Sequence, residues 1–444
     1  MRLRVFFCLK QGEYTNMNKE IKIIDYPCGS GKTTRMIENF KEDRKYLVIL
    51  PLLSEVDRVI EAAKGIKFVQ PDKNDNDQGT KTSSLESKLL LGSNIATTHE
   101  MYEKLVPMVR GGLLDDYDII IDEVPKVVEM VTSKSKTSIQ EFYLDAGYLD
   151  VDATTGLVRP TMKWWQNRDE VSDTLSPKIL TYAETGCLYL QEGKMFIWAL
   201  PQSILTAGRS VTVMTYKSEG SMLLAYLSKL GLPYEVSNDN KLEKDFRSKA
   251  AELITIENIP ALSKTNFSFT GQVKGMSSSS YATKIARSLK NLKERKLLGV
   301  DINNILLTSM KDAWIKAAND NNRDNESEDE APKKNIKPGV FAKDSRMKDV
   351  NWIANTTRGT NDYMHCSHLI YLYDQNINFI VARWLGDSSR AFNDAYALTE
   401  LIQWVWRSRV RRGEPITLYL PSPRMRRLFE EWLFNDKTNK NQSL

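Results

Sequence analysis

The feature that most constrains the fold is a short apolar run, Ile21–Ile24, followed at once by a loop that contains two glycines. The loop reads Asp-Tyr-Pro-Cys-Gly-Ser-Gly-Lys-Thr-Thr over residues 25–34. Glycines let backbone N–H groups converge on an anion, and the positive end of a following helix favours negative charge. The pattern therefore predicts a buried strand, a phosphate-binding loop and a helix that begins near Thr33.

Each part of such a loop has an expected task. Lys32 would reach the β- and γ-phosphates of a nucleotide, and the Thr33 hydroxyl would ligate Mg²⁺. Tyr26 stands where the general loop pattern has a further glycine. A chance glycine turn is the alternative, but it does not explain why strand, loop and helix patterns agree. The candidate phosphate-binding residues are Pro27, Cys28, Gly29, Ser30, Gly31, Lys32, Thr33 and Thr34.

A second apolar run, Asp118–Asp122, ends in two carboxylates, Asp122 and Glu123. In a parallel sheet, chemistry gathers at the carboxyl ends of the strands. We expect Asp122 to hold Mg²⁺ through water and Glu123 to orient or deprotonate an attacking water. Taken alone, such a strand end could equally be a surface loop or a helix N-cap, but the phosphate loop favours the catalytic interpretation.

The rest of the chain alternates short apolar runs with helical patterns. Continuous β-branched runs separated by helices are typical of parallel sheets covered on both faces, so the fold class is α/β with two doubly wound domains. Expected strands are 21–24, 46–50, 94–97, 118–122, 211–214, 251–256, 304–307, 368–373 and 416–420. Expected helices are 54–64, one from Ser221, 283–296 and 391–407.

The domains are expected at 18–235 and 236–436, with the polar segment Ser237–Arg247 at their boundary. Residues 1–17 are expected to be a disordered leader, and 437–444 a tail. Residues 131–200 hold three tryptophans without clear alternation, which indicates an insertion in the first domain. Residues 319–338 are rich in Asn and acidic side chains, so we expect a disordered loop in the second domain, or alternatively a regulatory or partner-binding segment.

Composition sets limits on function. Lys and Arg number 62 and Asp and Glu 57, so the net charge of +5 does not by itself establish a nucleic-acid partner. The basic cluster of Arg424, Arg426 and Arg427 is interpreted as a solvated face. Four scattered cysteines favour a reducing, cytoplasmic setting, and no apolar run approaches the roughly 20 residues needed to span a membrane. We therefore expect no membrane partner.

With these residues in place, the chain resembles superfamily 2 helicases, the DEAD/DEAH-box and related nucleic-acid-dependent ATPases. Residues 122–125, Asp-Glu-Val-Pro, are similar to motif II, and Pro27 stands where helicase phosphate loops have a proline. The resemblance covers about residues 20–425 and is most similar to members encoded by bacteriophages or other viruses, which would act in the host cytoplasm. Further stretches follow the order of the family: 50–54 (Ia), 96–99 (Ib), 212–215 (III), 304–308 (IV), 355–362 (V) and 403–411 (VI).

The resemblance implies two RecA-like domains with ATP and Mg²⁺ between them, and arginines from the second domain that stabilise charge on the γ-phosphate. It assigns Gln403 and Arg407 to this task. The second arginine is Arg409 or Arg411, of which Arg411 is preferred; a plain basic helix end is the alternative. Gly359 and Asp362 would couple nucleotide and nucleic acid. Candidate phosphate-backbone contacts, each of which could equally be a turn or cap residue, are Thr97, Thr98, Thr308, Thr356 and Thr357.

The expected function is an ATP-driven helicase or translocase on single-stranded or branched nucleic acid, with DNA favoured over RNA, in replication, recombination or repair. An RNA helicase of the same superfamily is one alternative. A nucleic-acid-binding protein with a degenerate ATPase core is another. A P-loop phosphotransferase would use the same Lys32, but it would need neither residues 403–411 nor a second α/β domain.

Overall fold

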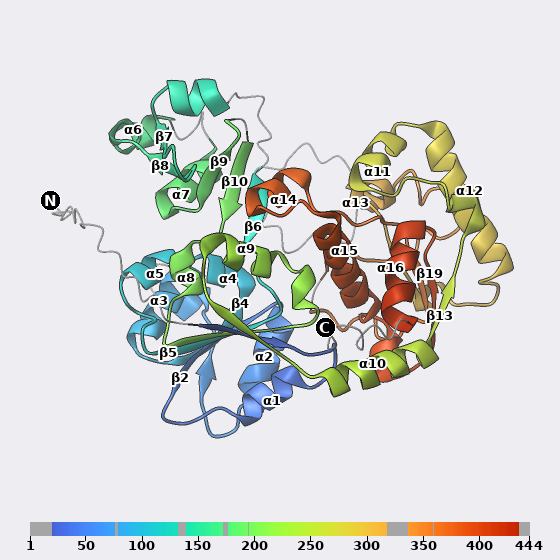
Figure 1. The fold of residues 1–444 in the computed structure, drawn as a ribbon, viewed down its shortest axis with the longest axis horizontal. Helices are drawn as coiled ribbons and strands as arrows, with labels where there is room; N and C mark the ends of the chain where they lie inside the picture. Colours follow the sequence, from blue (N-terminus) through green and yellow to red (C-terminus); the bar gives the residue numbers. More distant parts are fainter. Residues whose placement is uncertain are drawn as a thin grey trace, which may run out of the picture.

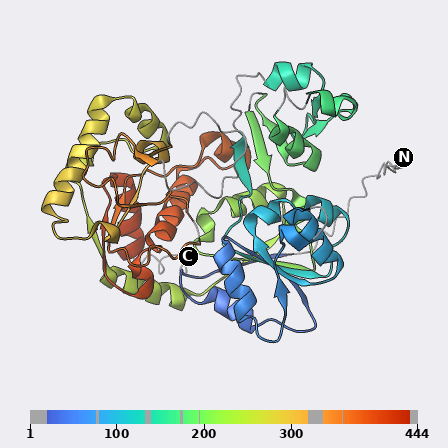
Figure 2. The same ribbon diagram turned by 180° about the vertical axis from the view of Figure 1, so that it is seen from behind.

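The computed structural model describes residues 20–75, 79–131, 139–171, 176–193, 195–317, 336–357 and 359–434. Within these ranges the chain builds two parallel β-sheets with helices on their faces and a smaller, mainly antiparallel part (Figure 1). Figure 2 shows from behind that the two parallel sheets lie side by side. The predicted α/β class with two doubly wound domains is confirmed. The predicted leader and tail lie outside the described residues.

The first sheet has seven parallel strands in the order β12-β1-β11-β5-β2-β4-β3. β11 therefore lies between the strand that precedes the glycine loop and the strand that ends in the acidic pair. The strands are β1 (Ile21–Asp25), β2 (Lys45–Leu50), β3 (Phe68–Val69), β4 (Asn94–Thr98), β5 (Tyr117–Asp122), β11 (Ser210–Thr215) and β12 (Tyr234–Asn238).

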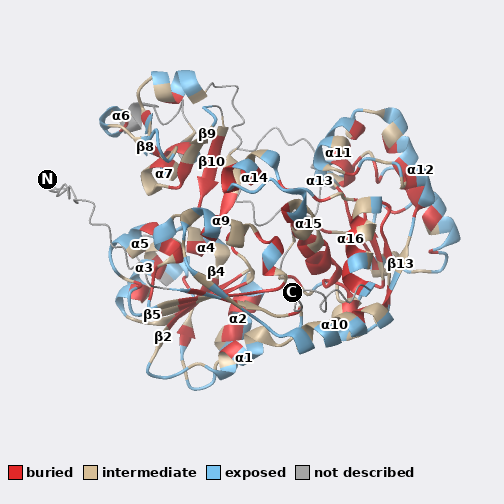
Figure 3. Ribbon diagram, viewed as in Figure 1, coloured by how far each residue is buried: buried red, intermediate tan, exposed pale blue. Residues whose placement is uncertain are grey.

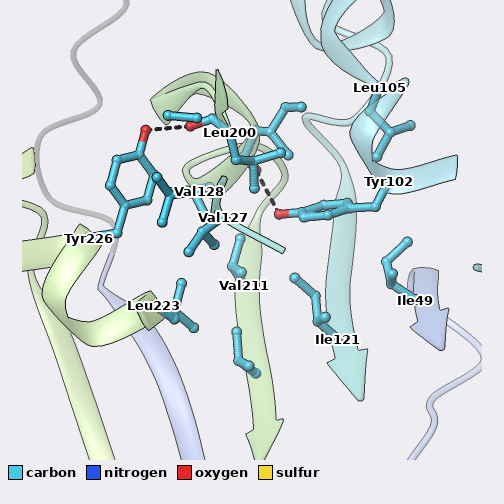
Figure 4. Packing of buried hydrophobic residues seen from close by; sticks show 14 of the residues in the cluster. Ile49, Tyr102, Leu105, Ile121, Val127, Val128, Leu200, Val211, Leu223 and Tyr226 are labelled. Atoms are coloured by element: carbon cyan, nitrogen blue, oxygen red, sulfur yellow. Dashed lines mark hydrogen bonds between the residues drawn. The ribbon is translucent and has the colours of Figure 1, made fainter. Parts of the chain in front are cut away.

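Helices cover both faces of this sheet because its central strands bury apolar side chains on both sides. On one face lie α1 (Lys32–Glu38) and α2 (Leu53–Ala62). The other face carries α3 (Lys81–Leu90), α4 (His99–Glu103), α5 (Val106–Arg110), α8 (Gln202–Leu205) and α9 (Met222–Leu230). In this second core the hydroxyls of Tyr102 and Tyr226 donate hydrogen bonds to the carbonyls of Ile204 and Leu200 (Figure 4), so neither buried hydroxyl is left without a partner.

Between β5 and β11 the chain leaves the first sheet and forms a separate part with its own apolar core around Trp164. Its main sheet is antiparallel, in the order β6-β10-β9. This part corresponds to the predicted insertion, although it begins earlier, at Val128. Its elements are β6 (Val128–Val131), β7 (Leu149–Val151), β8 (Val158–Pro160), α6 (Met162–Val171), α7 (Pro177–Thr185), β9 (Leu188–Gln191) and β10 (Met195–Ala199).

The second parallel sheet has the order β13-β19-β18-β14-β17. Its strands are β13 (Ile254–Glu257), β14 (Ile305–Thr308), β17 (Asn351–Trp352), β18 (His368–Tyr371) and β19 (Ile416–Tyr419). The helices of this half are α10 (Asn240–Leu253), α11 (Phe269–Met276), α12 (Ser279–Arg295), α13 (Lys311–Trp314), α14 (Phe379–Leu385), α15 (Arg390–Val405) and α16 (Pro423–Phe434). Figure 3 shows that the outer faces of α10 and α12 are exposed, as expected for helices that cover a sheet.

One predicted strand of this half needs correction. The polar segment Ser237–Arg247 contains the end of β12, which pairs with β1 as far as Asn238, and the start of α10 at Asn240. Asp239 caps α10 by accepting a hydrogen bond from Leu242 N at 2.9 Å. The helix runs on to Leu253, so the strand expected from residue 251 begins only at 254.

The loop predicted as disordered at 319–338 also ends earlier than expected. Residues Ile336–Pro338 form strand β16, which pairs in antiparallel fashion with β15 (Ile315–Ala317). The remainder of the predicted loop, 319–335, lies outside the described residues.

The second half reaches into the core of the first. Side chains of α14 and of the amino-terminal part of α15 belong to the same apolar cluster as the helices on the first sheet. Trp384 of α14 lies 5.2 Å from the ring of Tyr189 in the inserted part and 5.7 Å from that of Tyr226 on α9, measured between ring centroids. Lys229 Nζ lies 4.6 Å from the centre of the same tryptophan ring. α14 is therefore the point at which both halves and the insertion meet.

Candidate functional site

The glycine loop joins β1 to α1 in the way the sequence predicts. Gly29 and Gly31 have φ values of 74° and 81°, the left-handed region that glycine adopts without strain. A Cβ atom at either position would have no neighbour within 4 Å, so space lies open in front of the loop backbone. Lys32 Nζ donates hydrogen bonds to the carbonyls of Tyr26 at 2.7 Å and Pro27 at 3.2 Å. The ammonium group of Lys32 is thus held at the glycine loop, where it is expected to bind phosphate.

The acidic pair stands directly opposite this loop. Thr33 Oγ1 donates a hydrogen bond of 2.8 Å to Asp122 Oδ2, although the two residues are 89 positions apart. Glu123 has a φ of 64°, an unusual value for a non-glycine residue, and its N–H donates to the Met214 carbonyl at 2.8 Å. A hydroxyl and a carboxylate oxygen side by side are hard oxygen donors of the kind that Mg²⁺ prefers, so these two side chains fit the ion.

Burial shapes the charge of this pair. Asp122 is 9% exposed, and desolvation raises its pKa to about 6, with the neighbouring Glu123 adding to the rise. The Thr33 hydrogen bond and the charge of Lys32 act in the opposite direction. A buried carboxylate beside a second carboxylate needs a positive charge to be stable in its ionised form.

The second half supplies positive charge to the same place. Cys28 of the glycine loop packs against the core of the second half. Burial raises the pKa of the Cys28 thiol, and the charges of Lys32, Arg407 and Arg411 lower it in turn, so both arginines lie near the loop. Arg407 is 4% exposed and follows directly on the end of α15, on which Gln403 is buried as well.

The two alternatives for the second arginine lie in different surroundings. Arg409 Nε donates to the Pro415 carbonyl at 2.6 Å, and Arg409 N donates to the Cys366 carbonyl at 3.2 Å. Arg411 is partly exposed, and its charge reaches Cys28. The guanidinium of Arg409 is thus engaged in holding its own segment.

The motif V candidate lies against the motif Ia candidate. Gly359 has a φ of 77°, and a Cβ there would lie 2.7 Å from Pro51 Cγ. Asn361 Nδ2 donates to Glu55 Oε1 at 3.1 Å, and Asp362 accepts a hydrogen bond of 2.9 Å from Thr360 Oγ1. These contacts join the first and second halves, and the coupling role of Gly359 and Asp362 stays a prediction.

The five candidate nucleic-acid threonines divide into two groups. Thr97 is 3% and Thr308 0% exposed, so neither side chain is open to a large ligand in this conformation. Thr98 and Thr357 are partly exposed, and Thr356 is exposed. Side chains of the second group are thus open to solvent in this conformation, and all five backbone contacts stay predictions.

Two residues in the quoted motifs received no role from the sequence. His99 Nε2 lies 2.9 Å from the Asp122 carbonyl oxygen, so it joins the start of α4 to the acidic pair. The carboxylate of Asp25 accepts hydrogen bonds from Lys217 N, Ser218 N and Ser218 Oγ at 2.7, 2.8 and 2.7 Å. Both residues lie at or just after the carboxyl end of an expected parallel strand, and this position could have marked them as candidate site residues.

The arginines interpreted as a solvated face are instead structural. Arg424 is partly buried, and its guanidinium donates to Asp374 Oδ1 and Asp394 Oδ1, each at 2.8 Å. Arg427 adds a contact of 3.1 Å to Asp394 Oδ2. These ion pairs hold α16 against the segments on either side of α14.

A cavity of about 240 Å³ lies beside Lys32, between α1 and the first sheet. Apolar side chains form most of its wall, with Tyr26 and Arg35 also among the lining residues. A larger, open and more polar hollow of about 440 Å³ lies elsewhere on the first sheet, at Gly65 and Asn94. Among the described residues, no helix has the length and apolar character needed to cross a membrane.

Comparison with known proteins adds a family model and a relative. A model described as the YonV C-terminal Rossmann-like domain matches residues 248–433, which contain the whole second sheet. The "SPbeta prophage-derived uncharacterized protein YonV" of Bacillus subtilis (strain 168) is 26% identical over 441 residues, covering 94% of this chain and 100% of that protein. This chain is therefore similar to YonV over nearly its full length.

Two solved structures align with most of this chain. The structure named "XPD_APO" aligns with a TM-score of 0.50 at 15% identity, covering 94% of this chain and 96% of its own. A second, named "XPD_Helicase", aligns at 13% identity with a TM-score of 0.48, covering 94% and 95%. The likeness to the first shows a shared fold over nearly the whole of both chains.

The contact between Gly359 and Pro51 can be tested with a matched pair of substitutions. Gly359→Ala and Gly299→Ala place a Cβ at φ values of 77° and 80°, but a Cβ at Gly299 meets open space. Both variants bear the left-handed strain of about 1–2 kcal/mol, and Gly359→Ala should lose about 1–3 kcal/mol more through the clash. Thermal unfolding followed by circular dichroism measures the difference; equal shifts for the two variants would contradict the contact.

Proposed function

We propose that this chain is an ATP-dependent nucleic-acid helicase or translocase that acts on DNA in preference to RNA. The observation that carries the proposal is the hydrogen bond between Thr33 and Asp122, with the charges of Arg407 and Arg411 of the second half acting on Cys28 of the same loop. Two α/β halves that share one nucleotide site can convert binding and hydrolysis into relative motion.

The proposed chemistry assigns a task to each side chain. Backbone N–H groups of Gly29–Thr33 bind the phosphates, and Lys32 exchanges its two carbonyl partners for phosphate oxygens. Thr33 and Asp122 hold the cation, and Glu123 accepts a proton from the attacking water. Bound Mg²⁺ would supply Lewis-acid stabilisation of the phosphate charge. Arg407 and Arg411 contribute positive charge from the second half.

The cavity beside Lys32 is the proposed seat of the nucleobase. Its wall is mostly apolar, and a flat aromatic ring gains by leaving water for such a surface. Arg35 Cζ lies 5.8 Å from the centre of the Tyr26 ring at this cavity, so the site also offers a cation and an aromatic face.

The proposed track is a nucleic-acid strand bound by the exposed Thr356 and the partly exposed Thr98 and Thr357. Hydroxyl contacts to phosphates carry no sequence preference, which suits a motor that moves along a strand. The shared fold with a structure named for XPD supports this class of function. The prophage-derived relative supports an origin in a bacteriophage and action in the host cytoplasm. Replication, recombination or repair of DNA is the proposed setting.

The proposal predicts ATP hydrolysis that a polymer stimulates. Purified chain should hydrolyse ATP faster with single-stranded DNA than with RNA or alone. Lys32→Ala should lose ATP binding, whereas Glu123→Gln should retain binding and lose about 10²–10⁴-fold in kcat. A coupled ADP-release assay and fluorescent-ATP titration measure the two effects. Strand binding without turnover in the unaltered, folded chain would instead favour a degenerate ATPase core.

The arginines give a second, independent prediction. Arg407→Ala should lower kcat by about 10³–10⁵-fold, as expected when a charge on the γ-phosphate is removed. Arg411→Ala should lower kcat in the same direction, whereas Arg409→Ala should chiefly reduce stability, because Arg409 holds the Pro415 carbonyl. Single-turnover hydrolysis and thermal unfolding distinguish the two. A larger kinetic loss for Arg409→Ala than for Arg411→Ala would reverse the assignment.

A further inference from the structure

Asp25 is the last residue of β1, directly before the glycine loop, and it binds a segment far away in sequence. Its Oδ1 accepts a hydrogen bond from Lys217 N, and its Oδ2 accepts two, from Ser218 N and Ser218 Oγ, over 2.7–2.8 Å. The partners lie 192 and 193 positions away, in the turn that follows β11. Both oxygens of one carboxylate therefore hold one turn.

The turn needs such a partner. Lys217 has φ 58° and ψ 53°, the left-handed conformation that non-glycine residues rarely adopt. Strained backbone of this kind persists only where surrounding contacts enforce it. Successive N–H groups that converge on two carboxylate oxygens provide such contacts and satisfy two partly buried donors.

The same turn is the place where α15 of the second half rests on the first half. Thr399 Oγ1 donates a hydrogen bond of 3.1 Å to the Lys217 carbonyl. A Cβ at Gly220 would lie 2.3 Å from Thr399 Oγ1 and 2.4 Å from the Ala395 carbonyl oxygen, so the backbone of the turn touches the helix directly. A shift of the turn must therefore shift α15.

α15 carries the candidate groups of the second half. Thr399 and Gln403 are four residues apart and share one face of the helix, and Arg407 follows just after its end. Thr399 is thus hydrogen-bonded to the turn about two turns of chain before Arg407, whose charge acts on Cys28 of the glycine loop.

We propose that Asp25 is a positioning residue, which fixes the Lys217–Gly220 turn and thereby the place of Gln403 and Arg407 opposite the glycine loop. The inference rests on the proposed function and deepens it. The glycine loop begins at the carboxyl end of β1. The side chain of Asp25, the last residue of β1, fixes the position of α15 through the Lys217–Gly220 turn. β1 thus bears on both the glycine loop and the position of Arg407.

The test replaces the carboxylate without changing its size. In Asp25→Asn an NH₂ group takes the place of one acceptor oxygen and faces backbone N–H donors, so the turn should be released. The control is Asp116→Asn, since Asp116 is 79% exposed and lies just before the amino end of β5. Hydrogen exchange of peptides covering 217–221 and 390–405 should be faster in Asp25→Asn and unchanged in the control. Unchanged exchange in Asp25→Asn would overturn the inference.

The kinetic arm uses the full chain with ATP and single-stranded DNA. Asp25→Asn should lower kcat about 10²-fold, the loss typical of a misplacement of about 1 Å, while KM for ATP stays within about twofold. In an Arg407→Ala background the same change should cost nothing further, because Asp25 acts through that arginine. An additive loss, or a raised KM with unchanged kcat, would refute the positioning role.

A second variant guards against misfolding of Asp25→Asn. Thr399→Val keeps the shape of the side chain and removes only its hydrogen bond to the turn, so it should show the same kinetic pattern with a smaller loss of about tenfold. Wild-type activity from Thr399→Val together with unchanged exchange would also count against the inference. Absence of hydrolysis in the unaltered chain would overturn the proposed function, whereas the exchange arm tests the hold of Asp25 on α15 by itself.

Discussion

The hydrogen bond from Thr33 Oγ1 to Asp122 Oδ2 is the contact on which the candidate site depends. It requires that β1 and β5 end at the same edge of one parallel sheet, with β11 between them. Parallel pairing meets this requirement, because Asp25 pairs with Thr215 and Met214 pairs with Asp122 in register. The acidic pair, the glycine loop and the turn after β11 are thereby placed within reach of one another.

The second half is held to the first at three places of different character. α14 packs into the first core through Trp384 and its apolar neighbours. α15 rests on the Lys217–Gly220 turn, and Gly359 and Asn361 lie against Pro51 and Glu55 at the start of α2. The two halves are therefore joined by an apolar anchor at α14 and by contacts of single residues at the other two places.

Most of the strands and helices could be predicted from local patterns in the sequence. The strands around residues 21–24, 46–50 and 118–122 could be predicted because buried parallel strands are short, apolar and bounded by turns. The end of α10 could not, because the apolar residues 253–256 straddle a helix and a strand, and only pairing with β19 marks where the strand begins. Likewise, no periodicity indicates that α14 belongs to the first core, since an apolar helix packs equally well on either half.

The same limit applies to the site. Lys32, Asp122 and Glu123 were evident because their chemistry is tied to local motifs. The burial of Thr97 and Thr308, the place of Gly359 and the role of Asp25 depend on contacts between distant segments, which a single sequence does not encode in any local signal. The choice between Arg409 and Arg411 as the second arginine similarly depends on the contacts that each guanidinium makes after α15 ends, such as that of Arg409 with the Pro415 carbonyl.

A structure of the full chain with Mg²⁺ and a non-hydrolysable ATP analogue would show whether the glycine loop and the second half bind one nucleotide. We expect the phosphates on Gly29–Thr33, Lys32 in contact with the terminal phosphate, and Arg407 close to the same phosphate from the second half. An analogue bound away from the glycine loop, or bound there with Arg407 directed elsewhere, would contradict this expectation.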